Sequence, residues 1–352
     1  MMNEKESPPD LRENIPPTRW QRVGPVITLL LLAPVISEVL YGATRISFLF
    51  ALIPEIGIWG CGALIIRHVV RQRRRGWVSL LLLGLALAVA EECIIQQTSL
   101  APLIGSGSTN YGRAAGVNWI YLLWALGYES IWAVLVPIQL TELLFPSRRQ
   151  EPWMRRRGLA VAAIAFGLAS FVAWFTWTQQ ARPKVFHLPP YDPPLSYLGL
   201  ALVVIALFVW AAFALPDLPA KHLENRWSPR PWLVGLAVFG LGCPWGTLVL
   251  LGYGLFPRIP AGLVMGAALV WAASTFLLLK PWPSSPAWQD THRFALVSGA
   301  VMACMVSGFV VFVAGGALPL DWIGKIILNV AAIAALLRLG WKIKQRQEAV
   351  VP

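Results

Sequence analysis

The chain has 352 residues, of which 57% are hydrophobic and only 13% are charged, and its formal net charge is +12. A soluble domain is typically about 45–50% apolar and about 25% charged, so this composition excludes a soluble enzyme, a disordered chain and a disulfide-stapled secreted domain. Long uncharged stretches such as residues 79–90 predict helical membrane spans. Their apolar residues are continuous and do not alternate with polar ones, which excludes an outer-membrane barrel.

Ten apolar segments bounded by charge, Pro or Gly are expected to cross the membrane. In chain order they are residues 24–44, 46–66, 77–99, 117–140, 158–178, 195–215, 231–253, 259–279, 294–314 and 318–337, here called spans 1 to 10. The predicted fold is therefore an all-α, polytopic transmembrane helix bundle. Its expected parts are a mobile polar cytoplasmic tail (1–23), spans 1–4 with a carboxylate cluster (24–146), spans 5–10 (147–338) and a basic cytoplasmic tail (339–352).

The basic residues are distributed unevenly between alternate connecting segments. With the N-terminus inside, 23 of the 29 Lys and Arg residues fall on the cytoplasmic side. The positive-inside rule then places both termini in the cytoplasm and the chain in the cytoplasmic membrane as a multi-pass protein. Short arginine blocks between apolar runs are typical of contacts with the lipid bilayer and its anionic head groups, and we expect no nucleic-acid partner. The blocks are Arg71, Arg73, Arg74 and Arg75, and Arg155, Arg156 and Arg157.

This orientation gives a first testable prediction. A reporter fused after Arg75 or after Arg157 should read cytoplasmic, and one placed within residues 100–116 should read external, because the basic segments stay on the inside. An external signal after Arg75 would contradict the layout from span 2 onward.

Acidic residues are concentrated in the first four spans. Five of the 17 Asp and Glu residues lie within the predicted hydrocarbon there, and they are Glu38, Glu55, Glu91, Glu92 and Glu129. An ionisable side chain at mid-membrane costs about 2.5–3.5 kcal/mol on insertion scales, so five of them indicate function. At a rise of about 1.5 Å per residue they lie about 9–18 Å below the outer ends of their helices. The sequence thus predicts an outward-accessible polar chamber.

Polar neighbours are expected to share the faces of these acids. Gln96 follows Glu92 by four residues, and Asn118 precedes Glu129 by eleven, close to three turns. We therefore add Gln96 and Asn118 to the candidate binding residues.

Three further expectations concern the acids themselves. Arg45 follows Glu38 by seven residues and could pair with it. Glu91 and Glu92 are adjacent, so on an α-helix their side chains point about 100° apart and only one is expected to meet Glu129. Prolines at positions 34, 54 and 137 are expected to interrupt these helices and to free backbone carbonyls.

The histidines exclude several reaction types. All four lie in loops or at span ends, there is no HExxH helix, and no Gly-rich phosphate loop occurs. A zinc protease, a haem site with His ligands and a Ser–His esterase therefore lack their central group. We expect no metal centre and no cofactor, and the sequence assigns no catalytic residue.

Several segments between Pro34 and Pro146 resemble a group of bacterial multi-pass membrane proteins. The resemblance is carried by SEVLYGA, GALIIR, LLLGLALAVAEE, YGRAAGVNW and PIQLTELLFP. It implies a bacterial cytoplasmic membrane protein and implies no mechanism.

A second, partial resemblance is to the CAAX-protease and bacteriocin-processing family of intramembrane proteases. That family has a Glu-Glu pair on a membrane helix, an Arg four residues later and a His on a following helix. Glu91 and Glu92 match the pair, whereas Gln96 stands at the Arg position and Glu129 at roughly the His position. The resemblance implies that the glutamate pair would activate water, but the His that would orient the water is absent.

Three functional hypotheses follow from these residues. The leading one is an intramembrane carboxylate site that binds or transports a proton, a cation or a cationic small molecule. Glu91, Glu92 and Glu129 would be its coordinating groups, with Glu38 and Glu55 in support. The alternatives are a glutamate-dependent intramembrane protease-like protein, possibly degenerate, and a non-catalytic membrane scaffold.

Overall fold

The computed structural model describes residues 18–105, 107–108, 110–215 and 228–349. Within these residues ten helical segments are long and apolar enough to cross a membrane, which confirms the predicted all-helical fold and its ten spans. The tail expected over residues 1–23 lies mostly outside the described residues, and the first helix begins at Arg19. At the other end, residues 339–348 of the expected basic tail continue the last helix to Glu348, because Lys, Arg and Gln are good helix formers.

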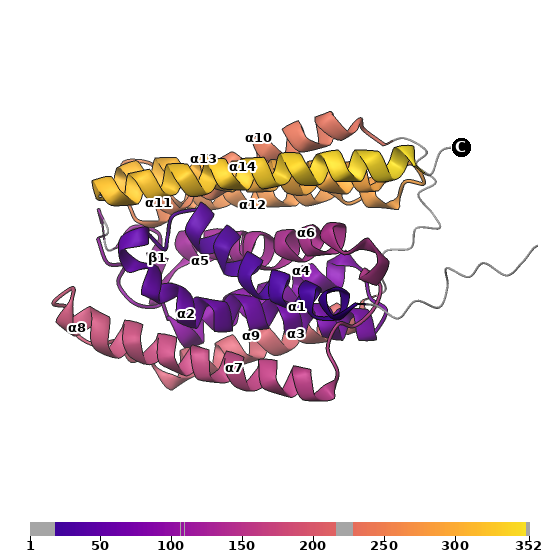
Figure 1. Cartoon of the computed structure of the whole chain (residues 1–352). Helices are drawn as coiled ribbons and strands as arrows, with labels where there is room; N and C mark the ends of the chain where they lie inside the picture. The colour runs from indigo at the N-terminus through magenta and orange to yellow at the C-terminus, as the bar shows by residue number, and fades with distance from the viewer. Residues whose placement is uncertain (1–17, 106, 109, 216–227, 350–352) are drawn as a thin grey trace, which may run out of the picture.

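Spans 1–4, which carry the five acids, form the central layer of the molecule (Figure 1). Span 1 consists of α1 (Arg19–Pro34) and η2 (Val35–Leu40), and span 2 of η3 (Ile46–Ala51), α2 (Leu52–Glu55), η4 (Ile56–Gly60) and α3 (Cys61–Gln72). Span 3 consists of α4 (Trp77–Ala90) and η5 (Glu91–Ile95), and span 4 of α5 (Trp119–Tyr128), η6 (Glu129–Leu135) and α6 (Val136–Leu144). A small antiparallel hairpin, β1 (Arg113–Ala114) and β2 (Val117–Asn118), precedes span 4, and the short 3₁₀ turn η7 (Pro146–Arg148) follows it.

The remaining spans cover the central layer on two sides. On one side lie α7 (Arg156–Trp174), η8 (Phe175–Ala181) and α8 (Arg182–Lys184) of span 5, with α9 (Leu195–Ala214) of span 6. On the other lie α10 (Pro231–Thr247) and α11 (Val249–Gly252) of span 7, α12 (Ala261–Leu279) and η9 (Trp282–Ser284) of span 8, α13 (Asp290–Ala314) and α14 (Pro319–Glu348). The other six spans thus cover the acid-bearing layer on two sides, while apolar side chains of spans 1 and 2 such as Leu31, Phe50 and Ile53 stay exposed.

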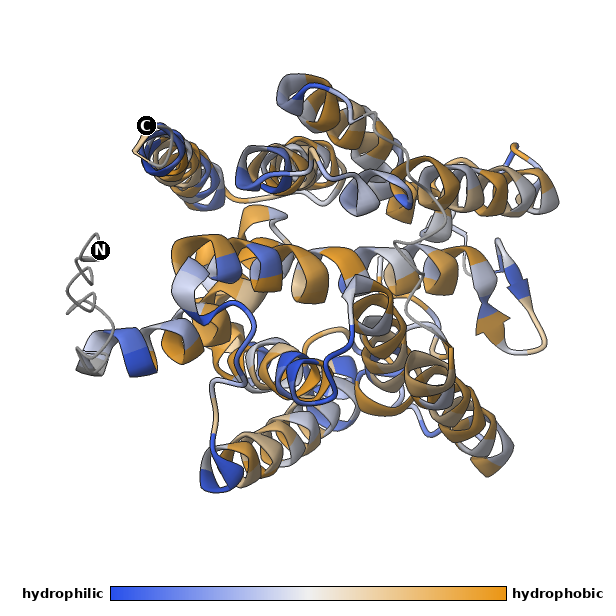
Figure 2. Cartoon of the chain, turned by 90° about the vertical axis from the view of Figure 1, so that its right-hand side faces the viewer, coloured by the Kyte–Doolittle hydropathy of each residue, from blue (hydrophilic) through white to orange (hydrophobic). Residues whose placement is uncertain are grey.

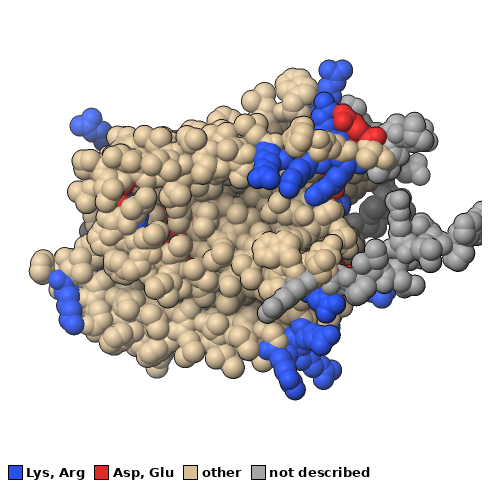
Figure 3. Space-filling view, viewed as in Figure 1, with Lys and Arg blue, Asp and Glu red and all other residues tan. Residues whose placement is uncertain are grey.

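The outside of the bundle is apolar along its length and charged at its ends. Hydrophobic residues run along the helices in Figure 2, and exposed large side chains such as Leu195, Leu263 and Val313 face outward. Basic surface gathers mainly at the end of the molecule where α14 ends (Figure 3). The start of α1 lies at this same end, as expected for an even number of spans.

Each acid-bearing span departs from α-helical geometry close to its acid. Glu38 lies within the π-helical turn η2, Glu55 directly precedes η4, and Glu129 is the first residue of η6. Glu91 and Glu92 open the π-helical turn η5. Single π-helical turns within α-helices are rare and frequently mark functional sites. The prolines explain part of this pattern, since Pro34 directly precedes η2 and has no N–H to continue the α-helical ladder.

Backbone carbonyls in and next to η2 accept hydrogen bonds from side chains of other spans. Tyr128 Oη donates to Ser37 O at 2.6 Å, and Cys304 Sγ donates to Ile36 O. Lys325 Nζ of α14 donates to Leu40 O at 2.8 Å and to Tyr41 O at 3.1 Å. Span 1 is therefore interrupted as predicted. The carbonyls at the interruption accept hydrogen bonds from side chains of spans 4, 9 and 10, and these bonds hold the π-helical turn that contains Glu38.

A buried ionic network joins spans 2 and 4 at the end of the bundle where α14 ends. Glu142 Oε1 accepts hydrogen bonds from Arg67 Nε at 3.0 Å and from Arg71 Nη2 at 2.8 Å. Arg67 is only 1% exposed and donates also to the carbonyls of Arg149 and Glu151, while its guanidinium lies over the Trp153 ring. The buried Arg67 guanidinium is therefore stabilised by the Glu142 carboxylate, by backbone carbonyls and by the Trp153 ring.

The expected pair between Arg45 and Glu38 is not formed. Arg45 Nη2 donates instead to Gly315 O at 3.0 Å, and its guanidinium lies over Phe312. The reason is that span 1 has ended before Arg45, which belongs to the connection that meets spans 9 and 10.

Candidate functional site

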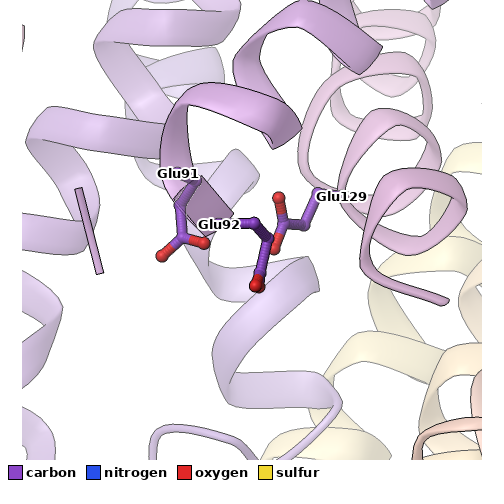
Figure 4. A group of neighbouring side chains, drawn as sticks. All are labelled: Glu91, Glu92 and Glu129. Carbon is purple, nitrogen blue, oxygen red and sulfur yellow. The ribbon is translucent and has the colours of Figure 1, made fainter. Parts of the chain in front are cut away.

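Three of the predicted carboxylates meet in the centre of the molecule. Glu91 and Glu92 come from span 3 and Glu129 from span 4, and one carboxylate oxygen of each lies within 4.8 Å of the other two. Figure 4 shows the carboxyl groups of Glu92 and Glu129 close together and Glu91 beside them. The three side chains are 3%, 2% and 6% exposed, respectively. We call this group the carboxylate trio.

The π-helical turn of span 3 explains how two adjacent residues reach one site. Gln96 N donates to Glu91 O at 2.9 Å, the i→i−5 bond of a π-helical turn. Such a turn contains more residues than an α-helical turn, so its successive side chains diverge less. The expectation that only one residue of the pair can meet Glu129 is therefore wrong, because it assumed an α-helical geometry that span 3 leaves at this point.

Hydrogen bonds hold Glu92 in place. Ser99 Oγ donates to Glu92 Oε2 at 2.6 Å, and Ser99 N donates to Glu92 O at 3.3 Å. The carboxyl groups of the trio also lie within hydrogen-bonding reach of one another. In the described part of the chain, however, no N–H or O–H group donates to Glu129 Oε2, which is buried. The trio therefore has an acceptor oxygen that is available for a ligand.

Within the described ranges, no basic side chain pairs with the trio. The ion pairs in the described residues involve other acids, namely Glu142, Glu151, Asp290 and Glu348. The buried Lys325 binds backbone carbonyls and the aromatic faces of Phe309 and Phe312. Negative charge on the trio is thus not compensated by a side chain of the described chain.

Glu38 and Glu55 lie near the trio but outside it. Glu38 is close enough to Glu55 and Glu92 for electrostatic interaction and lies within hydrogen-bonding reach of the Trp59 side chain. Thr44 Oγ1 donates to Glu55 Oε1 at 2.5 Å, while Glu55 Oε2 is buried without a partner. All five acids thus lie in the same region of the bundle. Glu91, Glu92 and Glu129 converge, whereas Glu38 and Glu55 have other polar contacts of their own.

Asn118 and Gln96 occupy different positions from those expected. The Asn118 side chain caps α5, accepting from Tyr121 N at 3.0 Å and donating to Gly252 O at 2.8 Å. Gln96 follows the last residue of η5, where span 3 has ended, and is half-buried. Neither side chain makes a hydrogen bond to the trio in the described structure, so their role in binding stays a prediction.

Two features of the site were not identified from the sequence. The rings of Tyr121 and Tyr253 meet edge to face, with centroids 5.7 Å apart, and both residues lie close enough to Glu92 for electrostatic interaction. Gln97 has a positive φ of 58°, is buried, and leaves its Oε1 without a hydrogen-bond partner. The position of Gln97 next to the Glu pair was visible in the sequence, but Tyr253 lies far away in the chain and only the fold brings it near.

The trio offers several oxygen donors close together within the bundle. Three carboxylate oxygens within 4.8 Å of one another could hold a metal ion, and carboxylates are the preferred ligands of hard divalent cations. The same oxygens can also take up protons. The positions of the histidines led us to expect no metal centre, whereas the tertiary structure brings together carboxylate oxygens that an ion could occupy.

Comparisons with known proteins agree with the membrane-spanning fold and name no reaction or ligand. The sequence model of an uncharacterized membrane protein family matches residues 27–344. No curated protein and no solved structure matches the chain. The match supports a multi-pass membrane protein, and it gives no support to the resemblance to CAAX proteases.

Proposed function

The chain belongs to this uncharacterized membrane protein family, and we propose that it binds a cation within the membrane at the carboxylate trio. The observation that carries this proposal is the convergence of Glu91, Glu92 and Glu129 in the buried interior of the bundle (Figure 4). Glu38 and Glu55 provide additional negative charge nearby.

The absence of a basic partner supports a cation as the ligand. A carboxylate removed from water is costly unless it is neutralised by a proton or paired with a positive charge. In the described structure no Lys, Arg or His forms an ion pair with the trio. Among the described residues none supplies the compensating charge, which supports a metal ion or protons from solution as its source.

The donor atoms indicate which metal ions fit. Every candidate ligand is a carboxylate or hydroxyl oxygen, from the trio and Ser99. Oxygen donors suit Mg²⁺, Ca²⁺ and Mn²⁺, whereas thiolates would select softer metals. Because the trio is buried, a bound ion would be shielded from water. We propose a hard divalent cation as the ligand, in competition with protons for the same oxygens.

The proposal also covers the orientation of the chain in the membrane and the depth of the trio. We infer that both termini are cytoplasmic and that the trio lies in the outer half of the cytoplasmic membrane. The start of α1 and the end of α14 at one end of the bundle, together with the basic surface there, support this orientation (Figures 1 and 3). Transport of the cation is the hypothesis that follows from such a site, and the hydrolase alternative is less favoured because no His of the described residues interacts with the trio to orient a water molecule.

Cation binding can be measured on the full chain purified in detergent. We expect Mn²⁺ or Ca²⁺ to bind the wild type by isothermal titration calorimetry, and Glu92→Gln to weaken binding at least tenfold. The change keeps the shape and the contact with Ser99 but removes one anionic ligand, and charge-assisted contacts contribute about 1.5–3 kcal/mol each. Affinity should fall as the pH is lowered, because carboxylates bind metal only when deprotonated.

The matched control is Glu151→Gln, which neutralises an acid that is 57% exposed and lies outside the trio. This variant should bind the ion as the wild type does. Equal weakening in both variants, or a wild type that takes up neither ion between pH 6 and pH 8, would contradict the proposal.

A further inference from the structure

A cavity lined by arginines lies away from the carboxylate trio, in the loops that join spans 2 and 3 and spans 4 and 5. It measures about 260 Å³ and is lined by Arg71, Arg74, Arg75 and Gln150. Among the described residues, its lining contains no acidic side chain. The volume is slightly below the roughly 300–1,000 Å³ of pockets for drug-sized ligands, so it suits a smaller group.

The fold orients two of these arginines before any ligand binds. Arg71 makes three hydrogen bonds to Glu142, from Nη2 to Oε1 and Oε2 at 2.8 Å and from Nε to Oε1 at 3.0 Å, and it also donates to Arg75 O. Arg75 donates to the carbonyls of Phe213 and Leu215, at the end of span 6. Guanidinium groups that are held in this way lose less conformational freedom when they bind an anion.

The charge around the cavity favours an anion. Arg67, Arg71, Arg74 and Arg75 surround the region, and Glu142 is the acid that contacts two of them. Guanidinium groups recognise phosphate through paired N–H donors, which gives both charge and geometry. Gln150 adds an uncharged side chain that can donate from its amide.

We propose that this cavity binds a phosphate group, and that the group is the head of an anionic phospholipid. The cavity lies at the ends of membrane-spanning helices, and Leu215 beside it is exposed, so an acyl chain could lie along the apolar outside of span 6. Basic pockets between transmembrane helices are a recurrent form of lipid recognition. This site is separate from the carboxylate trio and does not depend on cation binding there.

The test uses the delipidated full chain in detergent micelles, with thermal unfolding as the readout. Short-chain phosphatidylglycerol should raise the Tm saturably, while short-chain phosphatidylcholine should be at least tenfold weaker, because its choline is repelled by the arginines. Inorganic phosphate is the third titrant. Stabilisation by free phosphate at concentrations as low as those of phosphatidylglycerol would assign the site to a soluble phosphate compound and overturn the lipid.

Arg74→Gln is the informative variant, because Arg74 is exposed and its side chain makes no hydrogen bond or ion pair in the described structure. Arg71 is avoided because it holds Glu142. Arg74→Gln should weaken phosphatidylglycerol binding about tenfold. The matched control, Arg156→Gln, removes an exposed charge from the other basic block and should leave binding unchanged. Equal effects of the two variants, or equal stabilisation by both lipids, would overturn the site.

Discussion

Replacing Glu142 by Ala should lower the free energy of unfolding by about 3–5 kcal/mol, the cost of removing one partner from a buried ion pair. Arg67 would remain buried without its counter-charge, and Arg71 would lose all three of its hydrogen bonds to the carboxylate. The link between α3 and α6 would be lost with them. Chemical or thermal unfolding of the purified protein in detergent measures the effect.

The control for this prediction is Glu151→Ala. Glu151 also pairs with an arginine, Arg148, at 2.8 Å, but it is 57% exposed, so water compensates for its loss and the cost should be about 0–1 kcal/mol. If both substitutions cost the same, burial would not be the source of the stabilisation by Glu142.

Introducing a large side chain at Gly84 should disrupt both the packing and the carboxylate trio. A Cβ at Gly84 would lie 3.1 Å from Ser130 Cα and 3.2 Å from Ser130 O. These are mostly backbone atoms of η6 that cannot rotate away, so Gly84→Leu must push span 3 from span 4. Overpacking of this kind costs about 1–3 kcal/mol. Because Glu91 and Glu92 follow on span 3 and Glu129 precedes Ser130 on span 4, the ligand oxygens would separate and cation affinity should fall more than tenfold.

The same substitution at Gly167 provides a matched control. Gly167 lies on α7 of span 5, where a new Cβ meets nothing within 4 Å. Gly167→Leu should therefore leave stability and cation binding close to those of the wild type, and Gly84→Ala should fall between the two. Loss of stability without loss of cation affinity in Gly84→Leu would count against the trio as the binding site while leaving the packing argument intact.

The sequence by itself determined the class of the protein. Ten apolar segments with few charges can be buried only in a bilayer, and a helix satisfies its backbone hydrogen bonds within each segment, so the ten spans could be read directly. The energetic cost of acids in hydrocarbon also identified Glu91, Glu92 and Glu129 as a group worth testing. Both inferences depend on local composition, which is why no knowledge of the fold was needed.

Tertiary structure decided which of the candidates meet. An α-helical geometry predicts that Glu91 and Glu92 diverge, but the π-helical turn η5 brings both to Glu129. Asn118 shares the expected face of span 4, yet its amide caps α5 and binds Gly252. Arg45 was expected to pair with Glu38 and instead contacts Gly315 and Phe312. Helix ends, π-helical turns and contacts between distant spans depend on packing across the whole bundle, and a pattern of spacing along one helix contains no information about them.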